Sequence, residues 1–127
     1  MKIINTSISI FIISLIIGCS ELDKSFKEPL PDRVTYKSHI KAILDRSCVR
    51  CHGGSEQIVP DVNFSSYSEI KLLIGTDVSS DLIVPGNQSS GLLRKTKPGG
   101  SMNLNLNDNR DYDLLYQWIV LDSVAQN

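Results

Sequence analysis

The sequence has no excess of charge of either sign and few residues of the types that bind metals through sulfur or imidazole. Its 127 residues include 13 lysines and arginines against 14 aspartates and glutamates, a net charge of −1, with three cysteines, two histidines and two methionines. A near-neutral chain is a poor ligand for a polyphosphate backbone, so we expect no nucleic-acid partner. The length excludes a multidomain assembly, the 41% of hydrophobic residues excludes full disorder, and no internal repeat is present.

Long apolar runs are confined to the N-terminus. Lys2 precedes an apolar run at residues 8–17, which is short of the about 20 residues needed to span a bilayer and suits the centre of an export signal. The run ends at Gly18-Cys19, which resembles a bacterial lipobox. Residues 1–18 would then be a lipoprotein signal peptide, and Cys19 would carry the lipid. An uncleaved anchor and a plain secretory signal remain open as alternatives.

Residues 19–33 are expected to comprise the lipidated cysteine and a flexible tether. The segment is polar, and Pro29 and Pro31 favour an extended backbone. We therefore expect an exported protein whose lipid anchors it to the membrane of the bacterial cell envelope. The outer membrane is the expected site, on its periplasmic or surface face.

Residues 34–127 show the pattern of an all-α domain. Apolar residues at helical spacing predict a first helix over residues 36–47, with Thr35 as its N-cap. A second helix is predicted over residues 67–74 and is expected to end at Gly75.

Two further helices are predicted in the C-terminal half. A short helix is expected to begin near residues 89–90 and to be broken by Lys-Pro-Gly-Gly at residues 97–100. The last helix is predicted over residues 111–124 and capped at residue 108 or 109. Its buried side is predicted to consist of Leu114, Leu115, Trp118, Ile119 and Leu121.

Cys48 and Cys51 are followed directly by His52, and this Cys-x-x-Cys-His pattern is the attachment sequence of a c-type haem. Two thiols three positions apart on a helical turn can form thioethers with the two vinyl groups on one edge of the porphyrin. The next residue lies beneath the macrocycle, where an imidazole binds iron as the proximal ligand. We therefore expect one covalent haem c. Export agrees with this, because the attachment takes place outside the cytoplasm.

Three other uses of the cysteine pair are less well supported. A structural zinc site needs four ligands, and apart from Cys19 the chain offers two cysteines with His39 and His52 at unsuitable spacing. A thiol–disulfide exchange site requires a βαβ context and a reactive cysteine at a helix N-terminus. A disulfide between Cys48 and Cys51 would close a very small loop and stabilise the fold little.

The distal iron ligand can be sought among the remaining soft or nitrogen donors. Met1 belongs to the signal, which leaves Met102 as the one thioether, in a loop after Pro98-Gly99-Gly100. Glycines let the backbone approach a flat cofactor closely, so we expect Met102 to be the distal ligand. The alternatives are that Met102 only fills a hydrophobic gap and that His39 is the ligand instead.

These segments together resemble class I c-type cytochromes. The nearest resemblance is to the monohaem cytochrome c-like domains of exported bacterial lipoproteins, including those of the planctomycete type. The shared pattern is Cys-x-x-Cys-His-Gly at residues 48–53, Val-Pro-Gly at residues 84–86 with serine and leucine soon after, Met102, and Trp-Ile at residues 118–119. The resemblance covers residues 34–127, nearly all of the expected mature domain.

The resemblance implies a cytochrome c-like fold in which the N- and C-terminal helices pack around the haem. It implies covalent attachment through Cys48 and Cys51, with His52 proximal and Met102 distal. A carbonyl of Pro85 or Pro60 is expected to orient His52. The expected apolar walls of the haem site are Ile40, Leu44, Leu72, Leu92, Leu93, Leu104, Leu115 and Trp118.

Two positions depart from the family pattern. Asn103 stands where a proline usually follows the methionine, which leaves the methionine loop without a rigid ring. Asp122-Ser123 stands where Gly-Ala usually follows the tryptophan helix.

The expected function is single-electron transport by a His/Met-ligated haem, with unidentified redox proteins as donor and acceptor. Since both axial positions would be filled, we expect no enzymatic activity. The alternative is a haem-binding sensor or accessory module whose sixth ligand is labile.

Overall fold

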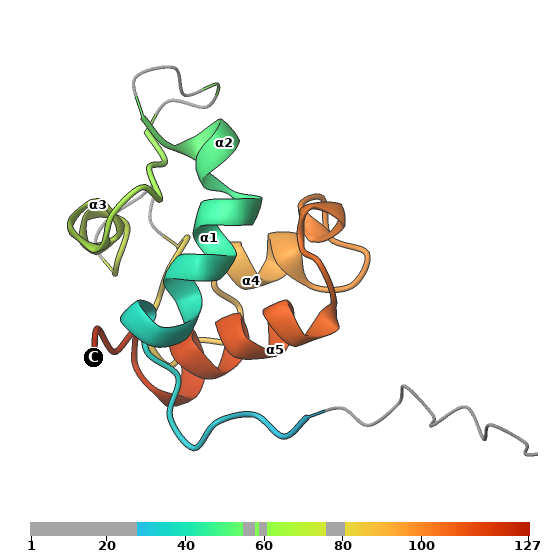
Figure 1. The fold of residues 1–127 in the computed structure, drawn as a ribbon. Helices are drawn as coiled ribbons and strands as arrows, with labels where there is room; N and C mark the ends of the chain where they lie inside the picture. The colour runs from blue at the N-terminus through green and yellow to red at the C-terminus, as the bar shows by residue number, and fades with distance from the viewer. Residues whose placement is uncertain (1–27, 55–57, 59–60, 76–80) are drawn as a thin grey trace, which may run out of the picture.

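The computed structural model describes residues 28–54, 58, 61–75 and 81–127. Within these residues there is no strand, and Ile74 and Ile83 form one isolated parallel bridge. The all-α prediction is thereby confirmed (Figure 1). The helices in chain order are the π-helix η1 (Tyr36–Ile40), α1 (Lys41–Ser47), α2 (Val49–His52), α3 (Tyr67–Leu72), α4 (Gly91–Thr96), the 3-10 helix η2 (Asn103–Asn105), α5 (Asn109–Tyr116) and the π-helix η3 (Gln117–Leu121).

The helices begin where capping side chains stand in the sequence. The Thr35 hydroxyl accepts the Ser38 N–H at the start of η1, and the Ser66 hydroxyl accepts the Glu69 N–H at the start of α3. The Asp108 carboxylate accepts the Asp111 N–H at the start of α5. Each bond satisfies a backbone donor that has no partner within its own helix, so the predicted starts are confirmed within one or two residues.

The helix ends are predicted less well. α3 ends at Leu72, two residues before the predicted end, because Ile74 forms its bridge with Ile83 and Gly75 donates to the Ile83 carbonyl at 3.0 Å. η3 ends at Leu121, three residues before the predicted end of the last helix.

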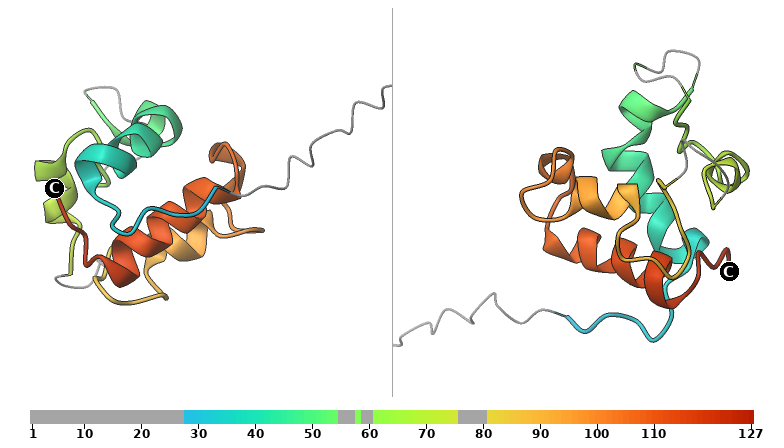
Figure 2. Two further views of the ribbon diagram at one scale, coloured as in Figure 1. Left: turned by 60° about the horizontal axis from the view of Figure 1, so that its bottom comes forward. Right: turned by 180° about the vertical axis from the view of Figure 1, so that it is seen from behind.

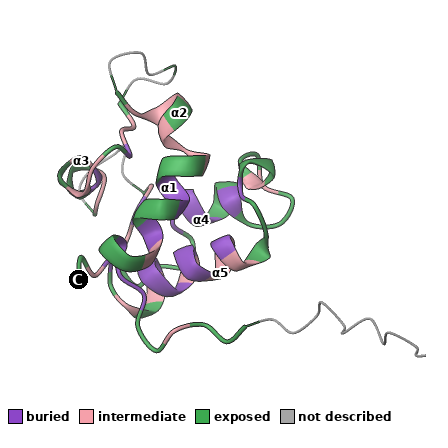
Figure 3. Ribbon diagram, in the orientation of Figure 1, coloured by how far each residue is buried: buried purple, intermediate pink, exposed green. Residues whose placement is uncertain are grey.

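The core lies where the first two helices, η1 and α1, cross the last two, α5 and η3. Figure 3 shows the buried positions gathered where α1, α4 and α5 face one another, whereas α2 and α3 are mostly half-buried or exposed. Ile43 and Leu44 of α1 share one buried cluster with Leu115, Trp118 and Ile119, as the resemblance implies. Burial of these side chains is the main stabilising contribution, about 1.5–3 kcal/mol for each large apolar residue.

An N-terminal strap, residues 28–34, lies along the outside of α5. Arg110 donates to the carbonyls of Glu28 and Pro29, the latter at 3.2 Å, and Gln117 donates to the Pro31 carbonyl at 2.8 Å. Figure 2 shows the strap running beside the helix. The described end of the expected tether is therefore attached to the domain.

Asp122, one of the two departures from the family pattern, fastens the end of this strap. Its carboxylate accepts the Val34 N–H at 2.7 Å and a proton of the Gln117 amide at 3.2 Å. The following residues, Ser123 and Val124, have positive φ angles of 50° and 62°. The chain thus makes a turn that glycine adopts most easily, and long-range hydrogen bonds hold it there.

The C-terminal tail covers the start of the first helix. The Ala125 carbonyl accepts the Tyr36 N–H at 2.8 Å and the indole N–H of Trp118 at 2.9 Å. Trp118 is fully buried, so its role is core packing with its one polar group satisfied.

Three leucines that were predicted to be buried are exposed. Leu72 is 74% exposed and Leu104 is 95% exposed, so neither forms a wall of the site, and Leu121 lies outside the buried face of the last helix. None of the helices in the described part of the chain is long and apolar enough to cross a membrane. Cys19 and the predicted signal lie outside the described residues.

Candidate functional site: one cavity between α2 and the methionine loop

A cavity of about 490 Å³ lies between α2, α4 and the η2 turn. Its volume is within the range of about 300–1,000 Å³ typical of cofactor sites. Four of the residues singled out from the sequence line it, namely Cys48, Cys51, His52 and Met102. The rest of the wall is mainly apolar and consists of Ile58, Val62, Phe64, Leu82, Leu92 and Leu106, together with Ser47, Lys95, Thr96 and Asn105.

The two cysteines lie on one helical turn. Cys48 forms the junction between α1 and α2, and its carbonyl accepts the N–H groups of Cys51 at 3.1 Å and His52 at 2.8 Å. Both thiols are free and half-buried. The predicted helical turn is therefore present and directs both sulfur atoms and the imidazole to one cavity.

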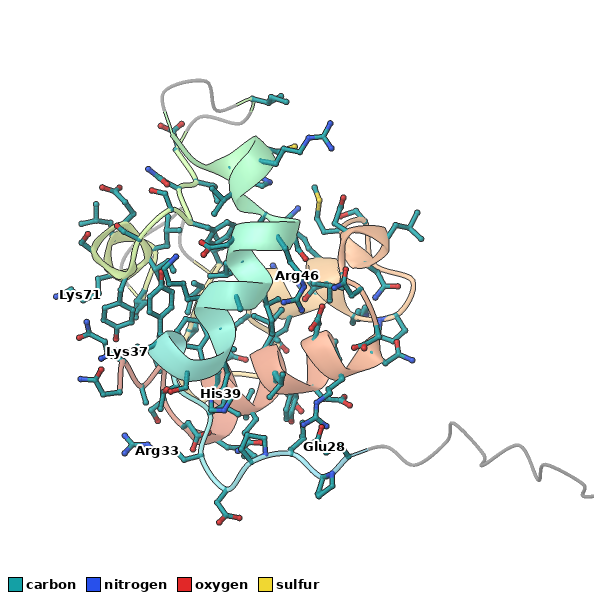
Figure 4. The ribbon with its side chains drawn as sticks, in the orientation of Figure 1. Glu28, Arg33, Lys37, His39, Arg46 and Lys71 are labelled. Carbon is teal, nitrogen blue, oxygen red and sulfur yellow. The ribbon has the colours of Figure 1, made fainter. Side chains whose placement is uncertain are left out.

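An ion pair fixes the end of α1 from which this turn continues. The guanidinium of Arg46 binds the carboxylate of Asp111, which is buried at the start of α5 and also accepts the Asn107 N–H at 3.1 Å. Figure 4 shows Arg46 lying between α1 and α5. The Asp111 carboxylate thus links Arg46, two residues before Cys48, to Asn107 in the segment that follows the methionine loop.

The Cys48 thiol is a poor nucleophile in this environment. Burial raises the pKa of Cys48 to about 11, and the nearby Arg46 charge offsets this only in part. Thiol–disulfide exchange depends on the thiolate and is typical of cysteines with a lowered pKa. The structure therefore gives no support to thiol–disulfide exchange as the role of Cys48 and Cys51.

His52 is held with its imidazole neutral. Burial lowers the pKa of His52, and the Lys95 charge lowers it further. The ring packs edge-on against Phe64 with centroids 5.7 Å apart, and the His52 carbonyl accepts the Phe64 N–H at 2.7 Å. A neutral imidazole keeps the lone pair that a metal needs.

One polar atom of His52 has no partner among the described residues. Its Nδ1 is buried without a hydrogen bond, so the structure shows no carbonyl in the orienting role expected of Pro85. The other expected acceptor is the carbonyl of Pro60, and this residue lies outside the described residues.

Gly53 lets the chain turn away directly after the histidine. A Cβ atom there would lie 2.8 Å from the Val49 Cγ1 and 3.0 Å from the Val49 carbonyl oxygen. A side chain at this position would therefore crowd Val49 on the α2 turn.

Met102 lies on a loop that folds back on the end of α4. Its N–H donates to the Lys95 carbonyl at 2.8 Å, and its side chain, 36% exposed, lines the cavity that His52 also lines. Figure 1 shows α2 above α1, and the turn after α4 to the right of α4. The imidazole and the thioether thus reach the cavity from different parts of the fold.

His39 is not part of this site. It belongs to η1 and lies near the N-terminal strap, at the end of the helix pair remote from α2 (Figure 4). Its Nδ1 accepts the Thr35 N–H at 3.2 Å, and it lines a separate polar hollow of about 430 Å³. The ring therefore helps to cap the first helix.

The donors present fit a c-type haem better than a zinc ion. No three histidine, cysteine or carboxylate side chains of the described residues form a group that could hold a metal ion. The thiols of Cys48 and Cys51 could form the two thioethers of a haem c, and the His52 imidazole and the Met102 thioether could bind its iron.

Most of the apolar wall was missed at the sequence level. Of the predicted wall residues, Leu92 lines the cavity, whereas Ile40, Leu44, Leu93, Leu115 and Trp118 belong to the core beneath it. Phe64 could have been found, because it is the only phenylalanine after residue 34 and follows the loop after the motif. Lys95, which among the described lining residues alone carries a fixed charge, has no local sequence signal.

Comparison with protein-family models, curated proteins and solved structures gives no match to this chain.

Proposed function

We propose that the chain is a monohaem c-type cytochrome that carries single electrons at the cell envelope. The observation that carries this proposal is that one largely apolar cavity gathers Cys48, Cys51, His52 and Met102. These four residues come from two segments 50 positions apart in the sequence, so the motif alone does not account for their meeting.

Each of the four side chains has a defined part in holding the cofactor. The thiols of Cys48 and Cys51, on one helical turn, would form the two thioethers of a haem c. His52, neutral because its pKa is lowered, offers a nitrogen lone pair to iron, and Met102 offers a soft sulfur. A haem c held by these residues would supply one-electron redox chemistry.

The remaining lining residues keep water away and bind the polar edge of the group. Phe64, Leu92 and Leu106 give the cavity apolar walls, which favour a macrocycle over bulk water. Lys95 is charged and lines the same cavity, so it can pair with a carboxylate of the bound group.

A carrier agrees better with this cavity than a peroxidase-like enzyme does. Its described lining includes neither a carboxylate nor a second histidine, so no side chain there is suited to general acid–base work beside the iron.

The second candidate, a haem-binding sensor or accessory module with a labile sixth ligand, is favoured by one observation. Met102 is 36% exposed and sits on a loop with no proline after it. Binding of an external ligand such as carbon monoxide distinguishes the two, because a carrier with a firmly bound sulfur binds it slowly.

The proposed location and partners follow from the N-terminus. We propose that residues 1–18 are removed, that Cys19 carries the lipid anchor, and that the domain meets redox proteins outside the cytoplasm. Labelling of the protein with a radioactive fatty acid, and its loss in Cys19→Ser, tests the anchor.

The cofactor is tested by producing the chain together with a haem-attachment system. A pyridine haemochrome assay and intact mass should show one covalent haem in the wild type and in Cys19→Ser, and loss of covalent haem in a Cys48→Ser/Cys51→Ser variant. His52→Ala should lose the low-spin spectrum, whereas His39→Ala, its matched control, should keep it. A wild-type chain that matures without haem would refute the proposal.

A further inference from the structure

The loop that presents Met102 is bound to α4 by its backbone. The Gly100 N–H donates to the Lys97 carbonyl at 2.7 Å, and the Met102 N–H donates to the Lys95 carbonyl. A Cβ atom on Gly100 would overlap the Lys95 carbonyl, so the loop lies directly on the last turn of the helix. This packing leaves the direction of the Met102 side chain to the residues that follow it.

Asn103 ties the next part of the loop to the same helix end. Its Nδ2 donates to the carbonyl of Thr96 at 2.9 Å, and Thr96 is the buried last residue of α4. Carbonyls at a helix C-terminus have no partner within the helix, so this bond caps α4 and holds the loop at once. Asn103 occupies the position where the resembled family has proline, and a hydrogen bond stands in for the rigidity of the ring.

Asn105 holds the sulfur itself. Its Nδ2 lies 3.7 Å from the Met102 Sδ and 3.5 Å from the Met102 carbonyl oxygen, and both residues line the cavity. A thioether sulfur has two lone pairs. A weak bond from the amide engages one of them and leaves the other for a soft metal, while restricting the rotation of the side chain.

We propose that Asn103 and Asn105 are positioning residues that together set how firmly the Met102 sulfur is held. Asn103 fixes the backbone of the loop, and Asn105 fixes the sulfur and draws electron density from it. This inference rests on the proposed haem-binding function. On this inference, the amides of Asn103 and Asn105 decide whether the protein is an electron carrier with a firmly bound sulfur or a protein whose sulfur ligand can be displaced.

Leu104 provides a matched control, because it lies between the two asparagines and is 95% exposed. Leu104→Ala changes the same 3-10 turn without removing either amide. Covalent haem content and far-ultraviolet circular dichroism, measured on every variant, verify that each one folds. Asn105 is exposed, and among the described residues its side chain makes hydrogen bonds with Met102 only. Asn105→Ala should therefore fold even if Asn103→Ala unfolds part of α4.

The haem-loaded protein is examined by three measurements. These are the weak far-red band of the ferric form that reports sulfur ligation, the rate of carbon monoxide binding to the ferrous form, and the midpoint potential. We expect carbon monoxide to bind about five- to tenfold faster in Asn103→Ala, which loses one hydrogen bond, and in Asn105→Ala, which loses the two weak amide contacts with Met102. Asn105→Ala should also lower the potential, because the sulfur then donates more strongly and favours ferric iron. Leu104→Ala should match the wild type.

The outcomes separate this inference from the proposed function. Wild-type protein without covalent haem, or with a spectrum that Met102→Ala leaves unchanged, overturns the ligand assignment on which both depend. Haem-loaded protein with a Met102-dependent band, in which both asparagine variants bind carbon monoxide at the Leu104→Ala rate, overturns the positioning role alone.

Discussion

Removing one hydroxyl from each of two neighbouring tyrosines should change the stability of the fold in opposite directions. The rings of Tyr36 and Tyr67 lie 5.0 Å apart between centroids. The Tyr36 hydroxyl is buried without a hydrogen-bond partner in the described structure, and the whole residue is only 6% exposed. The Tyr67 hydroxyl donates to the Val124 carbonyl at 2.9 Å. Both phenylalanine variants keep the ring contact, so each experiment isolates one hydroxyl.

The magnitudes follow from the cost of burying a polar group. An unsatisfied buried hydroxyl costs about 1–3 kcal/mol, so Tyr36→Phe should raise the free energy of unfolding by about 1 kcal/mol. Tyr67→Phe breaks a satisfied bond and should lower it by about 1 kcal/mol. In a domain of this size, the resulting difference of about 2 kcal/mol corresponds to a difference in melting temperature of about 10 °C.

The pH dependence gives an independent check on the Tyr36 environment. Burial raises the pKa of Tyr36 above its ordinary value of 10, mainly because the charged phenolate would lose its hydration. The folded state thus keeps its proton after the unfolded state has lost it, and this contribution to stability is complete below pH 10. It is lost as the pH rises from 10 through the folded pKa. Tyr36→Phe should therefore decline less steeply there, with a residual decline from Tyr112, whose pKa burial also raises.

The assay is urea unfolding followed by circular dichroism at equal haem content, at pH 7 and at several values above pH 9. Equal and negative effects of the two substitutions at pH 7 would refute the reasoning, because they would mean that the Tyr36 hydroxyl finds a partner in solution. An alkaline decline of Tyr36→Phe that is as steep as that of the wild type would refute the assigned origin of the pKa shift.

Two further substitutions test the framework around the site. Asp111→Asn removes a buried carboxylate that binds Arg46 and should lower the free energy of unfolding by about 2 kcal/mol. Asp45→Asn, the control, breaks the exposed pair with Lys41 and should change stability much less, because solvent screens that pair. Equal losses in urea unfolding would contradict the burial argument. Gly100→Ala forces the methionine loop off the Lys95 carbonyl and should cost about 1–3 kcal/mol, with a weakened far-red band; an unchanged melting temperature would show that the loop does not lie on α4.

Helix starts could be predicted from the sequence because each is decided by one local side chain. Thr35, Ser66 and Asp108 stand directly before the helices that they cap, and their oxygens bond to amides three residues on. Helix ends depend on partners far along the chain. The bridge between Ile74 and Ile83 ends α3 early, and no feature of the sequence within residues 67–74 predicts that bridge.

The residues of the site also fall into those that local sequence predicts and those that depend on contacts far along the chain. Cys48, Cys51 and His52 lie on one turn, so their spacing alone places them together, and Met102 could be proposed because it is the one thioether left after the signal. The apolar wall could not be predicted, because a leucine at helical spacing can face the core, the cavity or solvent. Leu104 shows this most clearly, since the two asparagines beside it bond to Thr96 and Met102 while the leucine side chain faces solvent.

Proline and asparagine stabilise a loop by different physical means, and the difference bears on function. A proline acts largely by restricting the unfolded chain, so its effect persists when the folded loop loosens. The Asn103 amide stabilises the loop only while its bond to the Thr96 carbonyl is made. A loop held in this way remains closed under stable conditions and opens for a modest change in free energy. Without that proline, the hold on the proposed sulfur ligand depends on the side-chain hydrogen bonds of Asn103 and Asn105, and their strength would decide between permanent and labile ligation.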